Sequence, residues 1–399
     1  MATAAQIPAG NARAQRPHAA NVYKPAGVKP IQTGIQWVDG GSKTVDSKVD
    51  LALPIRGFRL KLSGRVVIGT AAMTSVTPEG FLNLLPNIKI DGTNSRQGGN
   101  VTLWDIDLAT LFVMQHLHQH RAAHFQINGS SVSIPGMPFP SGYVTGATGT
   151  YDFLITVDLP AYPFGVGTGV RPGYLIREEE WKDTLSIALA FGTQAGAGAQ
   201  GSLGVAAGGT TVAFHAYGSG AGSPSIDLYS LPVQLGHLRG QVLPGLCTRT
   251  QRPINSILQT AGSPSSLIQL QKRRTSRIYL KVGTATLPPY FDTLSDTNVT
   301  SLGLVTGGGD RNVKPTVDLF AHKMDQAVDY NREPIQGYTC LDFLQSGNPD
   351  SSFPAQSDKV VGNGSTFELV GNVVGVANAY GIVVQEQVTY LHGGGLYNF

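Results

Sequence analysis

The chain has 399 residues, of which 41% are hydrophobic, 14% are charged and 8% are aromatic, and its formal net charge at pH 7 is +3. This apolar content supports one large domain or two medium ones, and it is too high for a disordered chain. A protein that neutralises nucleic acid over its whole surface is far more basic, so we expect no direct sequence-specific binding of nucleic acid.

Glycine and proline are abundant, with 50 and 24 residues. Many turns and few long helices follow from this, which favours an all-β protein of short strands joined by Gly/Pro-rich loops. The two cysteines, Cys247 and Cys340, are far apart, and we interpret both as reduced core residues. A signal peptide and an apolar run of about eighteen residues are absent, so we expect a product made and folded in a cytoplasm.

The first segment, residues 1–45, is predicted to be a basic N-terminal arm. It contains Arg13, Arg16, Lys24 and Lys29, and its first acidic residue is Asp39. Such a segment is either a solvated terminus or an arm that contacts an anionic surface, which would be lipid headgroups or a neighbouring subunit.

Residues 46–240 are predicted to form a first β domain. The segment 57–62 alternates polar and apolar residues with period two, as a half-buried strand does. A helix is predicted over 100–115, with Asn100 as its N-cap. Residues 192–224 are rich in Gly, Ala and Ser and are predicted to form long surface loops on either side of a strand. The other predicted strands are 65–68, 131–134, 151–159, 185–191, 211–217 and 226–233.

Residues 241–275 are predicted to be a linker, because they contain three prolines and few strand signals. A basic stretch at 272–274, followed by Arg277, precedes the second domain, residues 276–399. That domain repeats the layout of the first, with strands at 277–282, 366–374 and 380–390. A helix is predicted over 316–330, and it has an apolar stripe formed by Val317, Phe320, Met324 and Val328.

The histidines His116, His118, His120 and His124 form the one pattern that suggests a metal. On a strand the first three would share a face and could bind a transition metal. No carboxylate stands at ligand spacing, and the segment follows a predicted helix, so we favour exposed or interface histidines without a metal. A pH-sensitive contact is the lesser hypothesis.

Two further segments superficially resemble enzyme sites. The glycines of 165–169 lack the spacing, the following helix and the acidic partner of a nucleotide site. The acids Glu178, Glu179 and Glu180 are adjacent, and neighbouring carboxylates on a strand point to opposite faces. We therefore expect no enzyme activity and no cofactor.

Several stretches together resemble the double jelly-roll major capsid proteins of tectivirus-like, membrane-containing icosahedral phages. They are 55–62 after the N-terminal arm, 151–163 ("YDFLITVDLPAYP"), 177–183 ("REEEWKD") leading to 185–191, and the closing stretch 367–390. The resemblance implies two consecutive eight-stranded jelly-roll β-sandwiches standing side by side, with one short helix embedded in each.

The resemblance also implies a function. Such chains form pseudo-hexagonal homotrimers that tile an icosahedral shell around an internal lipid membrane, so the chain would be located in the virion capsid. Its partners would be neighbouring capsomers, the penton and minor capsid proteins, and membrane lipids contacted by Arg13, Arg16, Lys24 and Lys29. Two alternatives stay open: a minor capsid or spike component, and a carbohydrate-active β-sandwich, which would need a cleft with separated carboxylates.

Overall fold

The computed structural model describes most of the predicted strands and both predicted helices. The described residues are 23–48, 53–69, 73–76, 80–95, 98–118, 124–131, 147–163, 174–178, 180–194, 200–201, 203–206, 211–235, 245–255, 264–269, 274–283, 299–306, 312–331, 334–335, 337–343, 353–354, 367–373, 380–392 and 395–397. Arg13, Arg16, His120 and residues 165–169 lie outside them.

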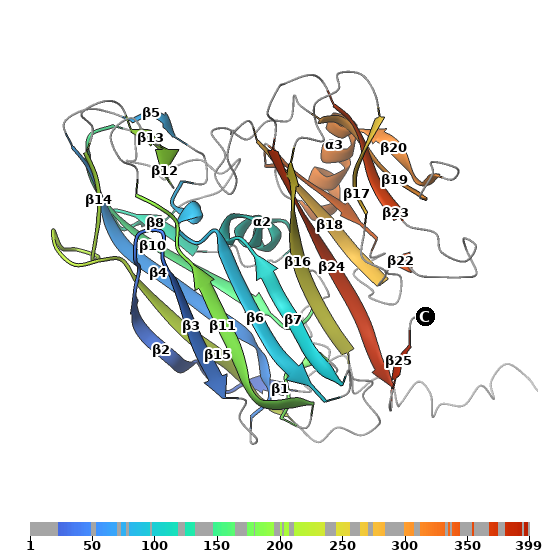
Figure 1. The fold of residues 1–399 in the computed structure, drawn as a ribbon, viewed down its shortest axis with the longest axis horizontal. Helices are drawn as coiled ribbons and strands as arrows, with labels where there is room; N and C mark the ends of the chain where they lie inside the picture. The colour runs from blue at the N-terminus through green and yellow to red at the C-terminus, as the bar shows by residue number, and fades with distance from the viewer. Residues whose placement is uncertain are drawn as a thin grey trace, which may run out of the picture.

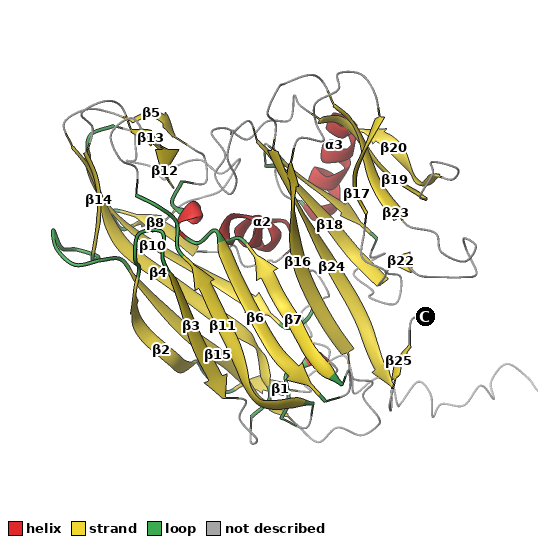
Figure 2. Cartoon of the chain, in the orientation of Figure 1, coloured by secondary structure: helices red, strands yellow, loops and turns green. Residues whose placement is uncertain are grey.

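The first half of the chain forms a sandwich of two sheets (Figures 1 and 2). One sheet has the order β2 (Lys29–Gln36), β15 (Ser225–Leu235), β4 (Ile55–Gly69), β10 (Gly149–Pro160) and β8 (His124–Ile127). The other has the order β3 (Ser42–Lys48), β11 (Trp181–Ala190), β6 (Asn87–Asn94) and β7 (Gly99–Ile106). Shorter elements around this sandwich are β1 (Tyr23–Pro25), β5 (Met73–Val76), η3 (Leu82–Leu84), β9 (Ser130–Ser131), β12 (Gln200–Gly201), β13 (Gly204–Ala206) and β14 (Thr211–His215).

The second half repeats this plan. One sheet has the order β16 (Gly245–Asn255), β24 (Tyr380–His392), β18 (Arg274–Gly283) and β21 (Tyr338–Asp342). The other has the order β17 (Pro264–Gln269), β23 (Phe367–Val373), β19 (Val299–Thr306) and β20 (Asn312–Asp318). The short strands β22 (Phe353–Pro354) and β25 (Gly395–Tyr397) extend the first of these sheets.

The two sandwiches are joined edge to edge. Strand β7 of the first pairs in parallel with β16 of the second, with Arg249 opposite Trp104. The sheet that contains β7 and the sheet that contains β16 therefore form one continuous sheet of ten strands. Helix α2 (Leu108–His118) lies at this junction, between the two halves of the molecule (Figure 1).

The inward-pointing side chains of β4 and β10, which alternate with period two, form part of the core of the first sandwich. The two strands pair without interruption from Gly57 with Pro160 to Gly149 with Ile68. Leu60, Leu62, Phe153 and Ile155 point inward and are completely buried, and the residues between them face outward. Described strands also confirm the predictions near 185–191, 211–217, 226–233, 277–282, 366–374 and 380–390.

The predicted helix over 100–115 begins too early. Residues 99–106 are strand β7, and the helix starts only at Leu108. Its N-cap is Asp107 and not Asn100, because the Asp107 carboxylate accepts a hydrogen bond from the Thr110 amide at 3.3 Å. The spacing of apolar residues in this segment matched a helix by coincidence, since Val101 and Leu103 follow the alternation of a strand.

The parts of the predicted arm and linker that the structure describes are mostly strands. Strands β1 and β2 and part of β3 fall within 1–45, and β16, β17 and the first two residues of β18 fall within 241–275, so these predictions were wrong there. β2 is an edge strand with mostly exposed side chains, and it therefore lacks the apolar alternation of a strand. In β16 the alternation is hidden by two buried polar side chains, Thr248 and the ion-paired Arg249.

The Gly/Ala-rich residues 192–224 also contain more structure than predicted. Strands β12 and β13 pair with each other, and β13 pairs with β5 to form a small three-stranded sheet. Leu203, in the turn between β12 and β13, is buried.

Helix α3 (Leu319–Tyr330) confirms the second predicted helix, but its predicted start was three residues too early, because residues 316–318, with Val317, end strand β20. Asp318 caps it by accepting a hydrogen bond from the Ala321 amide at 2.9 Å, and Asn331 ends it in the left-handed conformation. Among the described helices, none is long and apolar enough to span a bilayer.

Candidate functional site

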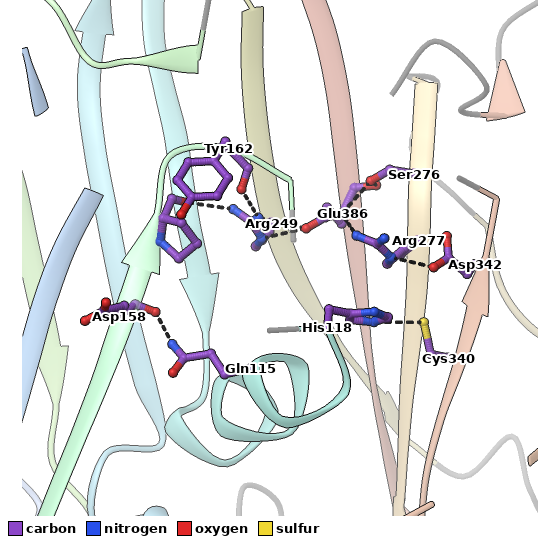
Figure 3. Close-up of polar contacts among 11 residues, drawn as sticks. Gln115, His118, Asp158, Tyr162, Arg249, Ser276, Arg277, Cys340, Asp342 and Glu386 are labelled. Atoms are coloured by element: carbon purple, nitrogen blue, oxygen red, sulfur yellow. Dashed lines mark hydrogen bonds and ion pairs between the residues drawn. The ribbon is translucent and has the colours of Figure 1, made fainter. Parts of the chain in front are cut away.

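The structural feature that dominates the junction is a set of buried charged side chains, which we call the seam cluster. Three cations and three carboxylates compose it, so its formal charge is balanced. The members are Arg249, Arg277, Lys281, Glu386, Asp342 and Asp107. Figure 3 shows four of them, Arg249, Glu386, Arg277 and Asp342, on strands of the second sandwich.

Arg249 of β16 links the second sandwich to the first. Its guanidinium donates to the Glu386 carboxylate at 2.9 Å and to the backbone carbonyls of Pro160 at 3.1 Å and Tyr162 at 2.7 Å (Figure 3). Its Cζ atom also lies 4.1 Å from the ring centroid of Trp104 on β7. The side chains of Arg249 and Glu386 are both 0% exposed. The charge of Arg249 is therefore satisfied jointly by β24 and by the end of β10.

Glu386 holds a second arginine. Its other carboxylate oxygen accepts from Arg277 at 3.1 Å and from the Ser276 hydroxyl at 2.8 Å. Arg277 also donates to Asp342 of β21 at 2.8 Å. Burial lowers the pKa of Arg277, but the electrostatic effect of Tyr279, Asp342 and Glu386 is larger, so the net result is a raised pKa. Arg277 therefore stays charged inside the molecule.

Lys281 and Asp107 form the third contact of the seam cluster and cross the junction directly. The Lys281 ammonium on β18 lies 3.1 Å from the Asp107 carboxylate, and the two side chains are 0% and 5% exposed. Asp107 is also the N-cap of α2. One carboxylate therefore starts the helix of the first sandwich and pairs with a strand of the second.

Apolar contacts surround the seam cluster. Tyr279, Cys340 and Val384 of the second sandwich pack into the same continuous core as the first sandwich. His118 is at the end of α2, and its ring centroid lies 5.6 Å from that of Tyr279 in an edge-to-face arrangement. Its Nε2 atom is 3.7 Å from the Cys340 sulfur. Burial lowers the pKa of His118 well below its usual value, and the charges of Arg277 and Arg249 lower it further.

The histidine pattern does not form the metal-binding face that a strand would give. His116 and His118 lie in α2, where residues two apart point about 200° apart around the axis. His116 is buried, whereas His124 is exposed at the start of β8. No group of three His, Cys, Asp or Glu side chains suited to a metal occurs among the described residues.

The other sequence-predicted residues are not brought together. Lys24 lies in β1 and Lys29 in β2, and both strands pair with β15, so neither residue belongs to a free arm. Glu180 is buried in the turn before β11, where its backbone carbonyl accepts from Ser95.

Sequence reasoning missed the seam cluster. Of its members, Arg277 was noted only as part of a basic stretch before a strand. An available signal was the charged residue inside each strand with strong β-character, such as Glu386 within the apolar stretch 380–390. A charged side chain in such a position needs a buried partner.

Comparison with known proteins identifies the fold. No protein-family model and no curated protein matches the chain. Among solved structures, the chain is similar to the major capsid protein of Sulfolobus turreted icosahedral virus, with a TM-score of 0.55 at 15% identity over 92% of this chain and 96% of that chain. It is also similar to PBCV-1 VP54, fitted into a reconstruction of the virophage Sputnik (TM-score 0.55, 11% identity, 93% and 96% covered). The Faustovirus major capsid protein gives a TM-score of 0.53 at 9% identity, with 92% and 90% covered.

These structural similarities establish the fold. The chain has the all-β double jelly-roll architecture of these viral capsid proteins, as its sequence predicted, with two sandwiches and, among the described residues, one α-helix in each.

Replacing Glu386 by Gln should destabilise the protein by about 3–5 kcal/mol, because two buried arginines would lose their shared counter-charge. The shift in denaturant midpoint measures this loss. Lys89→Met is the matched control: its ion pair with Asp91 is 43% exposed on the lysine side, and its removal should cost about 0.5 kcal/mol or less. Equal effects of the two substitutions would contradict the role given to Glu386.

His118 should make stability fall in mild acid. Its folded-state pKa lies below the usual 6.5, so the unfolded chain takes up the proton first as the pH falls. The stability that neutral His118 contributes is present above about pH 6.5 and is lost progressively below it. In thermal melts at pH 7.5 and 5.5, His118→Phe should show a smaller drop in Tm than the unmodified protein. His124→Gln, at an exposed position, should keep the full drop, and an unchanged drop in His118→Phe would refute the assignment.

Proposed function

We propose that this chain is a major capsid protein that assembles as pseudo-hexagonal trimers into an icosahedral shell around an internal lipid membrane. The observation that carries the proposal is the fold match, which extends over more than nine tenths of this chain and of several viral capsid proteins. A match to one sandwich alone would describe a very common architecture. A match to both, in the same order and joined in one chain, is far more restrictive.

The seam cluster supports the same function. A shell subunit has to keep a fixed shape while its outer surfaces bear contacts. The Lys281–Asp107 ion pair and the hydrogen bonds from Arg249 to the carbonyls of Pro160 and Tyr162 cross from one sandwich to the other. Sliding or rotation of the sandwiches would break these contacts and leave buried charges without their partners.

The role is structural and not catalytic in this proposal, and the chain is located in the virion after synthesis in the host cytoplasm. Its partners are two further copies in the trimer, the neighbouring capsomers, and the penton and minor capsid proteins. The internal membrane is contacted through the residues before β1. Because Lys24 and Lys29 belong to paired strands, the charges of this arm are Arg13 and Arg16, and residues 1–22 contain no acid.

Light scattering on a sizing column should show a species of three times the chain mass of 42.1 kDa. Negative-stain images of that peak should show hexagonal outlines. A monomer at micromolar concentration would contradict the trimer, and it would favour a minor virion component or a carbohydrate-active sandwich.

The lipid contact is tested with the variant Arg13→Ser, Arg16→Ser. At about 1 kcal/mol for each charge, its partition onto vesicles of phosphatidylglycerol and phosphatidylcholine should fall about 30-fold, as measured by flotation. The control is Lys43→Ser, which removes an exposed lysine from β3 and should leave partition unchanged. Equal binding by all three proteins would exclude the arm as the lipid contact.

A further inference from the structure

The two sandwiches correspond strand by strand. The sheet orders β2, β15, β4, β10 and β16, β24, β18, β21 match each other, and so do β3, β11, β6, β7 and β17, β23, β19, β20. In each sandwich the helix follows the last strand of the second sheet, which is β7 before α2 and β20 before α3. Each helix also begins with a capping aspartate, Asp107 or Asp318. α2 and α3 are therefore equivalent elements.

The two helices differ in what covers them. Ten of the eleven residues of α2 are buried, and the eleventh, His118, lies against Tyr279 of β18 and Cys340 of β21. In α3 the apolar stripe faces outward: Phe320 is 71% exposed, Met324 42% and Val328 81%. An apolar helix stripe normally faces a core, so this exposed stripe is a surface that lacks its cover.

The orientation of α3 is fixed by its polar side. Lys323 and Gln326 are buried, and they donate to the backbone carbonyls of Ile335 and Cys340. The ring of His322 lies 2.8 Å from the same Cys340 carbonyl. Turning the stripe inward would break these hydrogen bonds, so α3 keeps its stripe on the surface.

The first sandwich has a face that matches the face of β18 and β21 on which α2 packs. In the second sandwich, the face that receives α2 has Arg277 on β18 paired with Asp342 on β21 and Glu386 on β24. The equivalent face of the first sandwich has basic residues on β4 paired with acids on the equivalent strands β10 and β15. These pairs are Arg59 with Asp158, Arg65 with Asp152 and Lys61 with Asp227.

The same pattern is therefore covered in one sandwich and open in the other. Arg277 is 2% exposed, whereas Arg59 is 32%, Arg65 23% and Lys61 39% exposed. The strand edges repeat this difference. β7 pairs with β16, but the equivalent edges of β20 and β2 have no partner strand among the described residues.

We propose that the stripe of Phe320, Met324 and Val328 on α3 docks on the outer face of β4 and β10 of a second copy of this chain. The contact reproduces between copies the packing of α2 on β18 and β21 within one chain, and it brings β20 beside β2 of that copy. It is a head-to-tail contact, which generates a closed ring of three when copies are related by a threefold rotation. The inference rests on the proposed trimer and names the surfaces that close it.

The chemistry of α3 argues against a lipid surface as the occupant. The described charged residues exposed beside the stripe, Asp325 and Asp329, are acidic. These aspartates would repel anionic headgroups. The face of β4 is charge-balanced, since Arg59, Lys61 and Arg65 are each paired with one acid, and it would not repel them.

The first test is the double variant Phe320→Ser, Val328→Ser. Because both side chains are exposed in the single chain, thermal stability of the monomer should be unchanged. The loss of two apolar contacts at each interface should weaken association at least about 100-fold, measured by light scattering over a dilution series. Val38→Ser is the control, since Val38 is an equally apolar side chain that is 56% exposed in the turn between β2 and β3. A double variant that associates like the unmodified protein overturns the proposal.

The second test maps the contact directly. Val328→Cys is labelled with a benzophenone maleimide, and the native Cys247 and Cys340 are buried and do not compete. After irradiation of mixed ¹⁴N and ¹⁵N chains, mass spectrometry should find links between copies to peptides of β4, β10 or β2. Links to other segments in an intact trimer overturn this docking but leave the trimer standing. A monomeric protein with links only inside one chain overturns both.

Discussion

The buried pairing of Arg249 with Glu386 sets the geometry on which the rest of the molecule depends. A guanidinium without contact to water needs hydrogen-bond acceptors in fixed directions, and here the acceptors and an aromatic ring face come from three separate segments of the chain. Glu386 approaches from β24, two carbonyls approach from the end of β10, and Trp104 approaches from β7. Only one placement of the second sandwich brings these groups together. The parallel pairing of β7 with β16 and the burial of α2 follow from that placement.

The same charge pattern is buried in one sandwich and partly exposed to solvent in the other. Around Arg277 the charged side chains have almost no contact with water. Its ion pairs fix the positions of β18, β21 and β24 relative to one another, because breaking one would leave a buried charge without a partner. Around Arg59 and Arg65 the pattern is half-exposed, where such pairs contribute about 1 kcal/mol or less. The first sandwich therefore has a charged face that can stay in contact with water, and its ion pairs contribute little to the free energy of unfolding.

Much of the fold was predictable from local patterns. Strands β4, β10 and β15 alternate polar and apolar residues because one side of each faces a core, and that alternation is visible without any knowledge of the partners. Strands β2 and β16 were missed for opposite reasons. β2 lies at an edge and exposes most of its side chains, whereas β16 buries polar residues such as Thr248 and Arg249. Neither has the alternation that marks a strand in sequence.

By itself, the sequence determined the all-β class, the repeated layout of two halves and the existence of one helix in each, because these depend on composition and on short-range periodicity. The tertiary structure alone decided which charges are buried and which way each helix faces. Arg249 and Glu386 are 137 residues apart, and no local pattern connects them. The stripe on α3 shows the same limit. Its period is that of a core-facing helix, but the hydrogen bonds of Lys323 and Gln326 to carbonyls of distant residues turn it to the surface.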